Sequence, residues 1–133
     1  MTSDEKRKLI EVAARAREGA SAKHSKFQVG AALLTRAGET VTGANVESDS
    51  YGLTCCAERV ALFSAVTSGK RDFVAIAVVA RADGGPTPCG ACRQLLREYA
   101  PDAAVFVADS DNLNAIREFS VRGLLPDAFV LER

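Results

Sequence analysis

The sequence contains no tryptophan, one histidine and one methionine, and aromatic residues make up only 6% of its 133 residues. It has no surplus of charge either, because 17 basic residues balance 17 acidic ones. A protein that binds polynucleotides through their phosphates needs an excess of Lys and Arg, so a nucleic-acid polymer is not an expected partner. No apolar run approaches the roughly 20 residues of a membrane-spanning helix, so no membrane partner is expected. Residues 1–20 mix charges without the apolar core of a signal peptide, so we expect a cytoplasmic protein.

Hydrophobic residues make up 47% of the chain, which is enough for a packed core and excludes wholesale disorder. No segment has the composition of a linker, a low-complexity tract or an internal repeat. We therefore expect a single domain over residues 1–133.

Apolar periodicity predicts alternating helices and strands. A first helix is indicated by an apolar stripe of Leu9, Val12, Ala13 and Ala16, and the apolar run over 73–80 is typical of a strand covered on both faces. The second helix has few polar positions and is expected to be buried. The expected helices cover 4–19, from 55 or 56 to 69, 92–99 and 120–125, and the expected strands cover 28–35, 40–46, 73–80, 103–108 and, at an edge, 115–119. This order predicts an α/β fold, a three-layer α/β/α sandwich with a mixed five-stranded sheet.

Four cysteines in a protein without signs of secretion are poor candidates for disulfides, which favours a metal site or a reactive thiol. Three of them lie at the starts of two expected helices: Cys56, and the pair Cys89 and Cys92 with the spacing of metal ligands. A helix N-terminus stabilises the thiolate, which is the form that binds zinc. Three protein ligands leave one coordination position open, as in catalytic zinc sites, whereas structural sites use four.

Glu58 follows Cys56 by two residues, near enough to reach a water molecule at such an open position and to carry its proton. A redox pair or half of a zinc ribbon would explain Cys89 and Cys92 alone. Neither of these requires a Cys-Ala-Glu segment on another helix, so the sequence favours a catalytic zinc site.

Two further residues of metal-binding type receive a structural interpretation. Cys55 is expected to point about 100° around the helix from Cys56, and is interpreted as a small core residue. The single histidine, His24, is interpreted as a hydrogen-bonding residue of the scaffold.

The arrangement Cys-x-Glu followed by Pro-Cys-x-x-Cys is similar to the known signature of zinc deaminases. Combined with Phe27, the pair Asn45 and Glu47, and a terminal Leu-Leu-Pro-Asp-Ala-Phe, it makes the chain resemble the small homotetrameric cytidine deaminases of pyrimidine nucleoside salvage. The matching stretches are 25–33, 45–47, 51–53, 56–59, 88–94 and 124–129, which together span most of the sequence.

The resemblance implies a cytidine deaminase-like fold and a hydrolase that converts cytidine and 2′-deoxycytidine to the uracil nucleosides with release of ammonia. It implies one Zn²⁺ per chain, held by Cys56, Cys89 and Cys92, and a proton shuttle at Glu58.

The resemblance also implies which residues hold the substrate and surround the metal. Asn45 and Glu47 would bind the ribose 3′-hydroxyl group, and Phe27 would pack near the pyrimidine. Arg59 would donate a hydrogen bond to ligand sulfur, which offsets the net negative charge of three thiolates on one Zn²⁺. The remaining implied residues are Ala57 at the substrate, Gln94 beside the metal ligands, and Phe129, which would reach a neighbouring subunit's site in a homotetramer.

The residues alone leave plainer interpretations open for the substrate positions. Asn45 and Glu47 can be a polar strand end, and Phe27 and Phe129 can be core residues.

The chain departs from the pattern of that family in two segments. Lys23-His24 stands where Pro-Tyr is usual, and Ser48-Asp49 brings an additional acid close to Glu47. In an extended segment, Glu47 and Asp49 would leave on the same side and repel each other, which would raise the proton affinity of one of them.

Three other functions compete with the deamination of ordinary nucleosides. A deaminase of an aminoacylated cytosine nucleoside, of the blasticidin S type, is the nearest, because Asp49 could favour a cationic substituent. A polynucleotide-editing deaminase is disfavoured, since those enzymes usually carry His-x-Glu and a basic surface. A non-catalytic, zinc-stabilised binding module is disfavoured because it has no use for Glu58.

Overall fold

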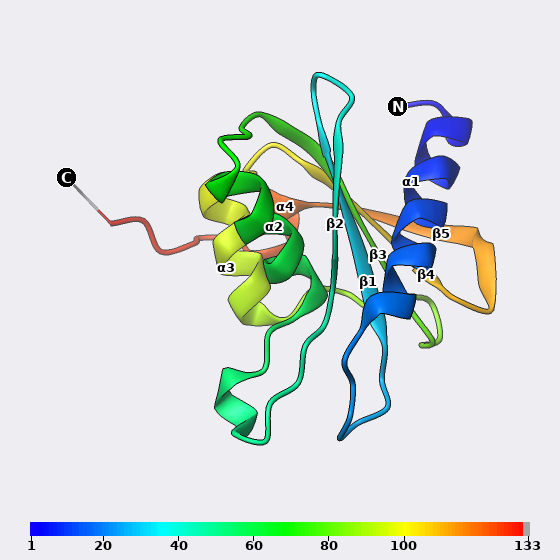
Figure 1. Ribbon diagram of the computed structural model, residues 1–133. Coiled ribbons are helices and arrows are strands. Elements are labelled where there is room, and N and C mark those ends of the chain that lie inside the picture. Colours follow the sequence, from blue (N-terminus) through cyan, green and yellow to red (C-terminus); the bar gives the residue numbers. More distant parts are fainter. Residues whose placement is uncertain (132–133) are drawn as a thin grey trace.

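The computed structural model describes residues 1–131 (Figure 1). Its helices are α1 (Ser3–Ala16), α2 (Ala57–Thr67), α3 (Gly90–Tyr99) and α4 (Val121–Leu124), with short 3-10 turns η1 (Arg17–Gly19) and η2 (Tyr51–Leu53). Its strands are β1 (Val29–Thr35), β2 (Thr40–Ala44), β3 (Phe73–Ala80), β4 (Ala104–Asp109) and β5 (Asn112–Ser120).

The strands form one five-stranded sheet in the order β2-β1-β3-β4-β5. β1 pairs antiparallel with both β2 and β3, β3 pairs parallel with β4, and β4 pairs antiparallel with β5. The chain passes from β3 to its parallel neighbour β4 through α3. The expectation of a mixed five-stranded sheet is confirmed.

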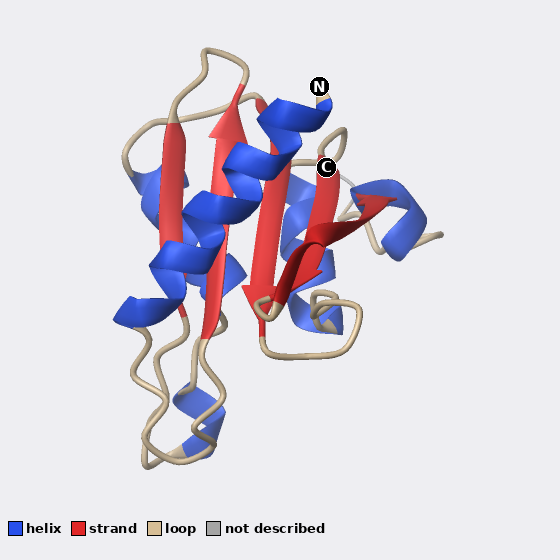
Figure 2. Cartoon of the chain, turned by 90° about the vertical axis from the view of Figure 1, so that its right-hand side faces the viewer, coloured by secondary structure: helices blue, strands red, loops and turns tan. Residues whose placement is uncertain are grey.

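Helices cover both faces of the sheet, as Figure 2 shows from the side of α1. On that face the apolar stripe of α1, with Leu9, Ile10 and Ala13, packs on the sheet around Phe106. On the other face, α2 and α3 pack on the remaining strand residues, and Leu62 and Leu96 are fully buried there. The three-layer α/β/α sandwich is therefore confirmed, and β3, apolar throughout, is buried between the layers.

Several element boundaries differ from the expected ones. The first helix ends at Ala16 and continues only as the 3-10 turn η1. β5 covers Asn112–Ser120 and is longer than the expected 115–119. Its first residues were not predicted, because exposed Asn112 and Asn114 lack the apolar alternation that marks a half-buried strand. α2 was expected to be buried, but it is buried on one side only, and its Phe63 is 43% exposed.

Within residues 1–131, no helix combines the length and the apolar character that crossing a membrane requires.

Gly30 sets how closely α1 approaches the sheet. A Cβ atom at this position would lie 2.0 Å from the carbonyl oxygen of Ala13 and 2.5 Å from the backbone nitrogen of Arg17. Both atoms belong to backbone that cannot move without displacing the end of the helix.

We therefore expect Gly30→Ala to lower the free energy of unfolding by about 1–3 kcal/mol, the usual cost of overpacking. Gly19→Ala is the matched control, because nothing lies within 4 Å of its added Cβ atom. Urea denaturation of both variants measures the difference. Equal stability of the two would contradict the packing that we describe at Gly30.

Candidate metal centre

Three cysteines from two helix starts come together on the α2/α3 side of the sheet. Cys56 is the N-cap residue of α2, Cys89 is the N-cap residue of α3, and Cys92 lies in the first turn of α3. Their sulfur atoms all lie within 4.8 Å of one another. The sulfur of Cys89 is 3.8 Å from that of Cys56 and 3.4 Å from that of Cys92.

These separations fit a tetrahedral zinc ion. With Zn–S bonds of about 2.3 Å and tetrahedral angles, two sulfur ligands lie about 3.8 Å apart. The free N–H groups of two helix N-termini also favour negative charge at this point. The predicted cluster is confirmed, and it is placed to hold a metal with three protein ligands.

The neighbourhood favours the thiolate form of Cys56. A hydrogen bond from the thiol of Cys92, together with one from Arg59, holds the pKa of Cys56 well below its usual range. The reciprocal interaction with Cys56 and burial raise the pKa of Cys92. Cysteine binds zinc as the thiolate, so metal binding releases the protons that these thiols carry.

Glu58 is a buried carboxyl group on the first turn of α2, with only 6% of its surface exposed. Burial raises the pKa of Glu58 to about 7, and the nearby charge of Cys56 acts in the same direction. A carboxyl group with a pKa near neutrality can both accept and donate a proton at neutral pH. Its position beside the cysteines therefore suits a proton carrier.

Arg59, in the first turn of α2, contacts the cysteine cluster. Its Nη2 atom donates to the sulfur of Cys56 at 3.5 Å and to the backbone oxygen of Thr54 at 3.3 Å. Its buried Nε atom has no hydrogen-bond partner within the part of the chain that the structure describes. The guanidinium group thus supplies positive charge next to one of the three thiolates.

Contrary to the expectation for a residue beside the metal ligands, Gln94 directs its side chain to other hydrogen-bond partners. Its amide nitrogen donates to the backbone oxygen of Phe129 at 3.2 Å and to the carboxylate of Glu98 at 3.4 Å. On the described residues 1–131 it makes no hydrogen bond to a cysteine. Gln94 therefore fixes the C-terminal segment to α3.

Cys55 is half-buried and belongs to neither apolar cluster, so its interpretation as a core residue is wrong, as is the expected helical position. Cys55 precedes α2 in an extended segment, where its backbone forms two hydrogen bonds with Val46. Its sulfur is not part of the cluster. Helix geometry could not apply, because Cys56 is the N-cap residue and the helix begins only at Ala57.

Two loops extend side by side beyond one end of the sheet, as Figure 2 shows below β1 and β2. The first covers 20–28 and the second covers 45–54, and the backbones of Ser21, Asn45 and Glu47 join them at their base. The side chain of Asn45 accepts from the N–H of Val29 at 2.8 Å and donates to the backbone oxygen of Phe27 at 2.8 Å. Asn45 is therefore a buried scaffold residue, with one amide hydrogen and one lone pair of its Oδ1 atom left for a ligand.

Glu47 belongs to the second loop, and its side chain reaches the first loop. Its carboxylate accepts hydrogen bonds from the backbone N–H groups of His24 and Ser25, at 2.9 and 3.0 Å, and from the Ser25 hydroxyl group. These hydrogen bonds, with that of the hydroxyl group foremost, lower the pKa of Glu47. The expected repulsion between Glu47 and Asp49 does not raise the pKa of Glu47, because Asp49 pairs with Lys23 and His24 instead. Opposite charges at the two departures from the family pattern were the signal for this pairing.

A cavity of about 410 Å³ opens between these loops, lined by His24, Ser25, Glu47, Tyr51 and Thr54. Since the backbone oxygen of Thr54 accepts from Arg59, which in turn contacts Cys56, this cavity lies beside the cysteine cluster.

Phe27 and Phe129 are not core residues. Phe27 is 42% exposed and Phe129 is 70% exposed. The segment that carries Phe129 projects from the body of the molecule beyond α4 (Figure 1). Ala57, by contrast, is completely buried where α2 begins.

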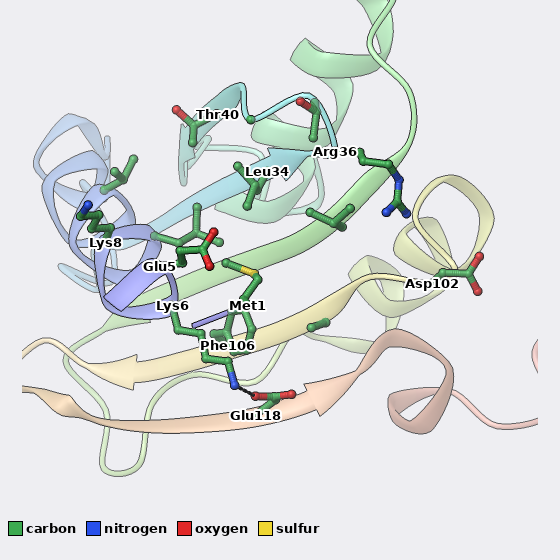
Figure 3. A pocket seen from close by; sticks show the side chains of 16 residues that line it. Met1, Glu5, Lys6, Lys8, Leu34, Arg36, Thr40, Asp102, Phe106 and Glu118 are labelled. Atoms are coloured by element: carbon green, nitrogen blue, oxygen red, sulfur yellow. Dashed lines mark hydrogen bonds and ion pairs between the residues drawn. The ribbon is translucent and has the colours of Figure 1, made fainter. Parts of the chain in front are cut away.

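A larger cavity, of about 710 Å³, lies on the opposite face of the sheet beside α1 (Figure 3). An ion pair of 2.7 Å between Lys6 and Glu118 crosses it, and Phe106 lies beneath Lys6. The sheet separates this cavity from the cysteines, so it takes no part in the metal centre.

Comparison with known proteins agrees with this geometry. The sequence profile described as the cytidine and deoxycytidylate deaminase zinc-binding region matches residues 3–108. A cytidine deaminase of Halalkalibacterium halodurans is 53% identical over 93% of this chain and 93% of that protein. The crystal structure of a cytidine deaminase from Burkholderia pseudomallei is 47% identical, with a TM-score of 0.87 over 97% of this chain and 100% of that one.

The similarity to a blasticidin-S deaminase of Bacillus cereus is more limited, with 37% identity over 62% of this chain and 65% of that protein. The profile match covers the three cysteines and Glu58, and the structural match extends over almost the whole fold. The chain belongs to the cytidine and deoxycytidylate deaminase family.

Proposed function

We propose that this protein catalyses the zinc-dependent hydrolysis of cytidine and 2′-deoxycytidine to uridine and 2′-deoxyuridine, with release of ammonia. The observation that carries the proposal is the buried carboxyl group of Glu58 beside a cluster of three cysteines. A purely structural zinc site would use a fourth protein ligand and would not need an acid that titrates near neutrality.

Cys56, Cys89 and Cys92 would hold the zinc ion, one per chain. When bound, zinc supplies a Lewis acid with an open coordination position that makes water more acidic. Arg59 keeps positive charge against the sulfur of Cys56 and so limits the electron donation of three thiolates to the metal.

Glu58 moves the protons of the reaction. The oxygen of water forms a bond to C4 of the cytosine ring while Glu58 accepts a proton from the water and delivers it to N3. Glu58 then carries the second proton to the amino group at C4. The C4–N bond breaks, ammonia leaves, and the uracil nucleoside remains. Each transfer needs the same carboxyl group in alternating states, which its pKa of about 7 permits.

The two loops would bind the nucleoside. Glu47, held ionised by its hydrogen bonds, is suited to accept a hydrogen bond from a hydroxyl group of the ribose. Asn45 fixes the backbone of Phe27 and Val29 at the end of the first loop and has one amide hydrogen for the sugar. Phe27, half-exposed at the adjoining strand start, would pack near the pyrimidine, and Ala57 would face the base at the start of α2.

The assembly that fits these residues is a homotetramer with shared active sites. The support is the projecting segment with Phe129, Val130 and Leu131, each more than 60% exposed, which residues 1–131 of a single chain leave uncovered. Residues 1–133 would act as one domain, since both apolar clusters pack on the same sheet. Four cysteine thiols without a disulfide among them fit the cytoplasm.

The structure weakens the argument for an aminoacylated substrate. That argument needed a free carboxylate at Asp49, but this group is paired with Lys23 at 2.9 Å and with His24 at 3.1 Å. Ordinary cytosine nucleosides are therefore the favoured substrates.

The metal assignment can be tested by analysis of the purified protein, for which we expect close to one zinc per chain. Cys89→Ala should lose most of the metal, and solubility with it, because metal affinity is partly folding free energy. Cys55→Ala is the matched control and should keep its zinc, since Cys55 lies outside the cluster. Full zinc in the Cys89 variant would refute the ligand assignment.

The role of Glu58 predicts that Glu58→Gln keeps its zinc and its fold but loses at least about 10²–10⁴-fold in kcat, the usual worth of general acid–base catalysis. Glu98→Gln, an exposed carboxyl group on α3, should retain the parental kcat. Cytidine turnover is followed by ultraviolet absorbance. Near-parental activity of Glu58→Gln would favour the non-catalytic binding module.

Shared active sites predict complementation between two inactive variants. Phe129→Ala and Glu58→Gln should each have low activity as pure proteins. After unfolding together and refolding, the mixed tetramers should regain part of the parental activity, because some sites then combine an intact Glu58 with an intact Phe129 from a neighbour. Light scattering checks the assembly, and a fully active monomer would exclude this arrangement.

A further inference from the structure

Three side chains outside the proposed chemistry meet at the tip of the two loops: Lys23 and His24 from the first loop, and Asp49 from the second. One oxygen of Asp49 accepts from Lys23 Nζ at 2.9 Å and lies 3.1 Å from His24 Nε2. We call these three side chains the clasp. Lys23 and His24 form one departure from the family pattern, and Asp49 belongs to the other. The side chains of the two departures therefore pair with each other.

The clasp sits at the open end of a series of contacts that joins the loops. At the base, Ser21 and Glu47 pair through their backbones, with the N–H of Glu47 donating to Ser21 at 2.9 Å. In the middle, the carboxylate of Glu47 accepts from the N–H groups of His24 and Ser25. At the tip, Asp49 holds the two residues that begin this turn.

The turn that carries these donors is itself a closed unit. The N–H of Lys26 donates to the backbone oxygen of Ala22 at 3.0 Å, and Lys26 has a positive φ of 61°. The ring of His24 also packs edge-on against Tyr51, with ring centres 5.3 Å apart. A displacement of Lys23 or His24 would therefore also move the two N–H groups that bind the carboxylate of Glu47.

We propose that the clasp is a positioning device for substrate binding, in which Lys23 and Asp49 keep the first loop against the second and so hold Glu47 in its ribose-binding orientation. The inference rests on the function proposed above for Glu47. Asp49 is thus a positioning residue, because the Oδ1 atom of its carboxylate binds Lys23 and His24 of the first loop.

The test exchanges the charges of the pair. Lys23→Asp and Asp49→Lys each place like charges together, and the double variant K23D/D49K restores an attractive pair in reverse. The matched control is Asp102→Lys, which breaks the ion pair of Asp102 with Arg122. The side chains of that pair are 79% and 53% exposed, against 84% and 50% for Asp49 and Lys23.

We expect each single variant to raise the KM for cytidine about two- to fivefold with kcat unchanged, the size of effect that an exposed ion pair supports. The double variant should return KM to near the parental value, and Asp102→Lys should leave KM unchanged. A residue that only stabilised the fold would not separate KM from kcat in this way.

Hydrogen exchange gives a second readout that does not depend on catalysis. The amides of His24 and Ser25 should exchange faster in both single variants and recover in the double variant. If exchange and KM stay at parental values, or if the double variant fails to recover, the clasp is refuted. If exchange rises while KM does not, the clasp holds the loop without positioning Glu47, which also overturns the proposal. A parental protein that does not turn over cytidine would refute the proposed function, and the exchange data would then judge the clasp alone.

Discussion

The close approach of two helix N-termini is the constraint on which the rest of this structure depends. Cys56 and Cys89 are the N-cap residues of α2 and α3, so their sulfur atoms can meet only if both helices begin at the same end of the sheet. Small residues make this possible. A Cβ atom at Gly43 on β2 would lie 2.5 Å from the backbone of Ala57 and Ala61, so glycine is what allows α2 to lie so low on the sheet. The metal centre is thus a consequence of tight packing between layers.

That constraint also explains why one carboxyl group can serve the chemistry. Glu58 follows Cys56 on the first turn of α2, and the same packing that brings the helix down to the sheet removes Glu58 from water. Burial raises its pKa to about 7, where it exchanges protons readily. The metal ligand and the proton carrier are therefore positioned by a single helix start. A displacement of α2 would affect both.

Local patterns were sufficient for the layers of the fold and for the cysteine cluster. A buried strand can be recognised from the apolar run of β3 alone, and a pair of metal ligands from the spacing of Cys89 and Cys92. Contacts between distant segments could not be predicted in this way. The link of Gln94 to Phe129 spans 35 residues, and the pairing of Asp49 with Lys23 depends on how two loops meet. The exposed β5 carried no apolar alternation from which its length could be inferred.

We propose that Glu58 and the three cysteines, assembled by this packing, serve the hydrolysis of the C4–N bond of a cytosine nucleoside. The most direct test of this proposal is the reaction of the zinc-loaded protein with cytidine in water enriched in ¹⁸O, with uridine and ammonia measured together. We expect equimolar uridine and ammonia, with the label in the oxygen at C4 of uridine. A zinc-loaded protein that leaves cytidine unchanged, or that forms uridine without the label, would contradict it.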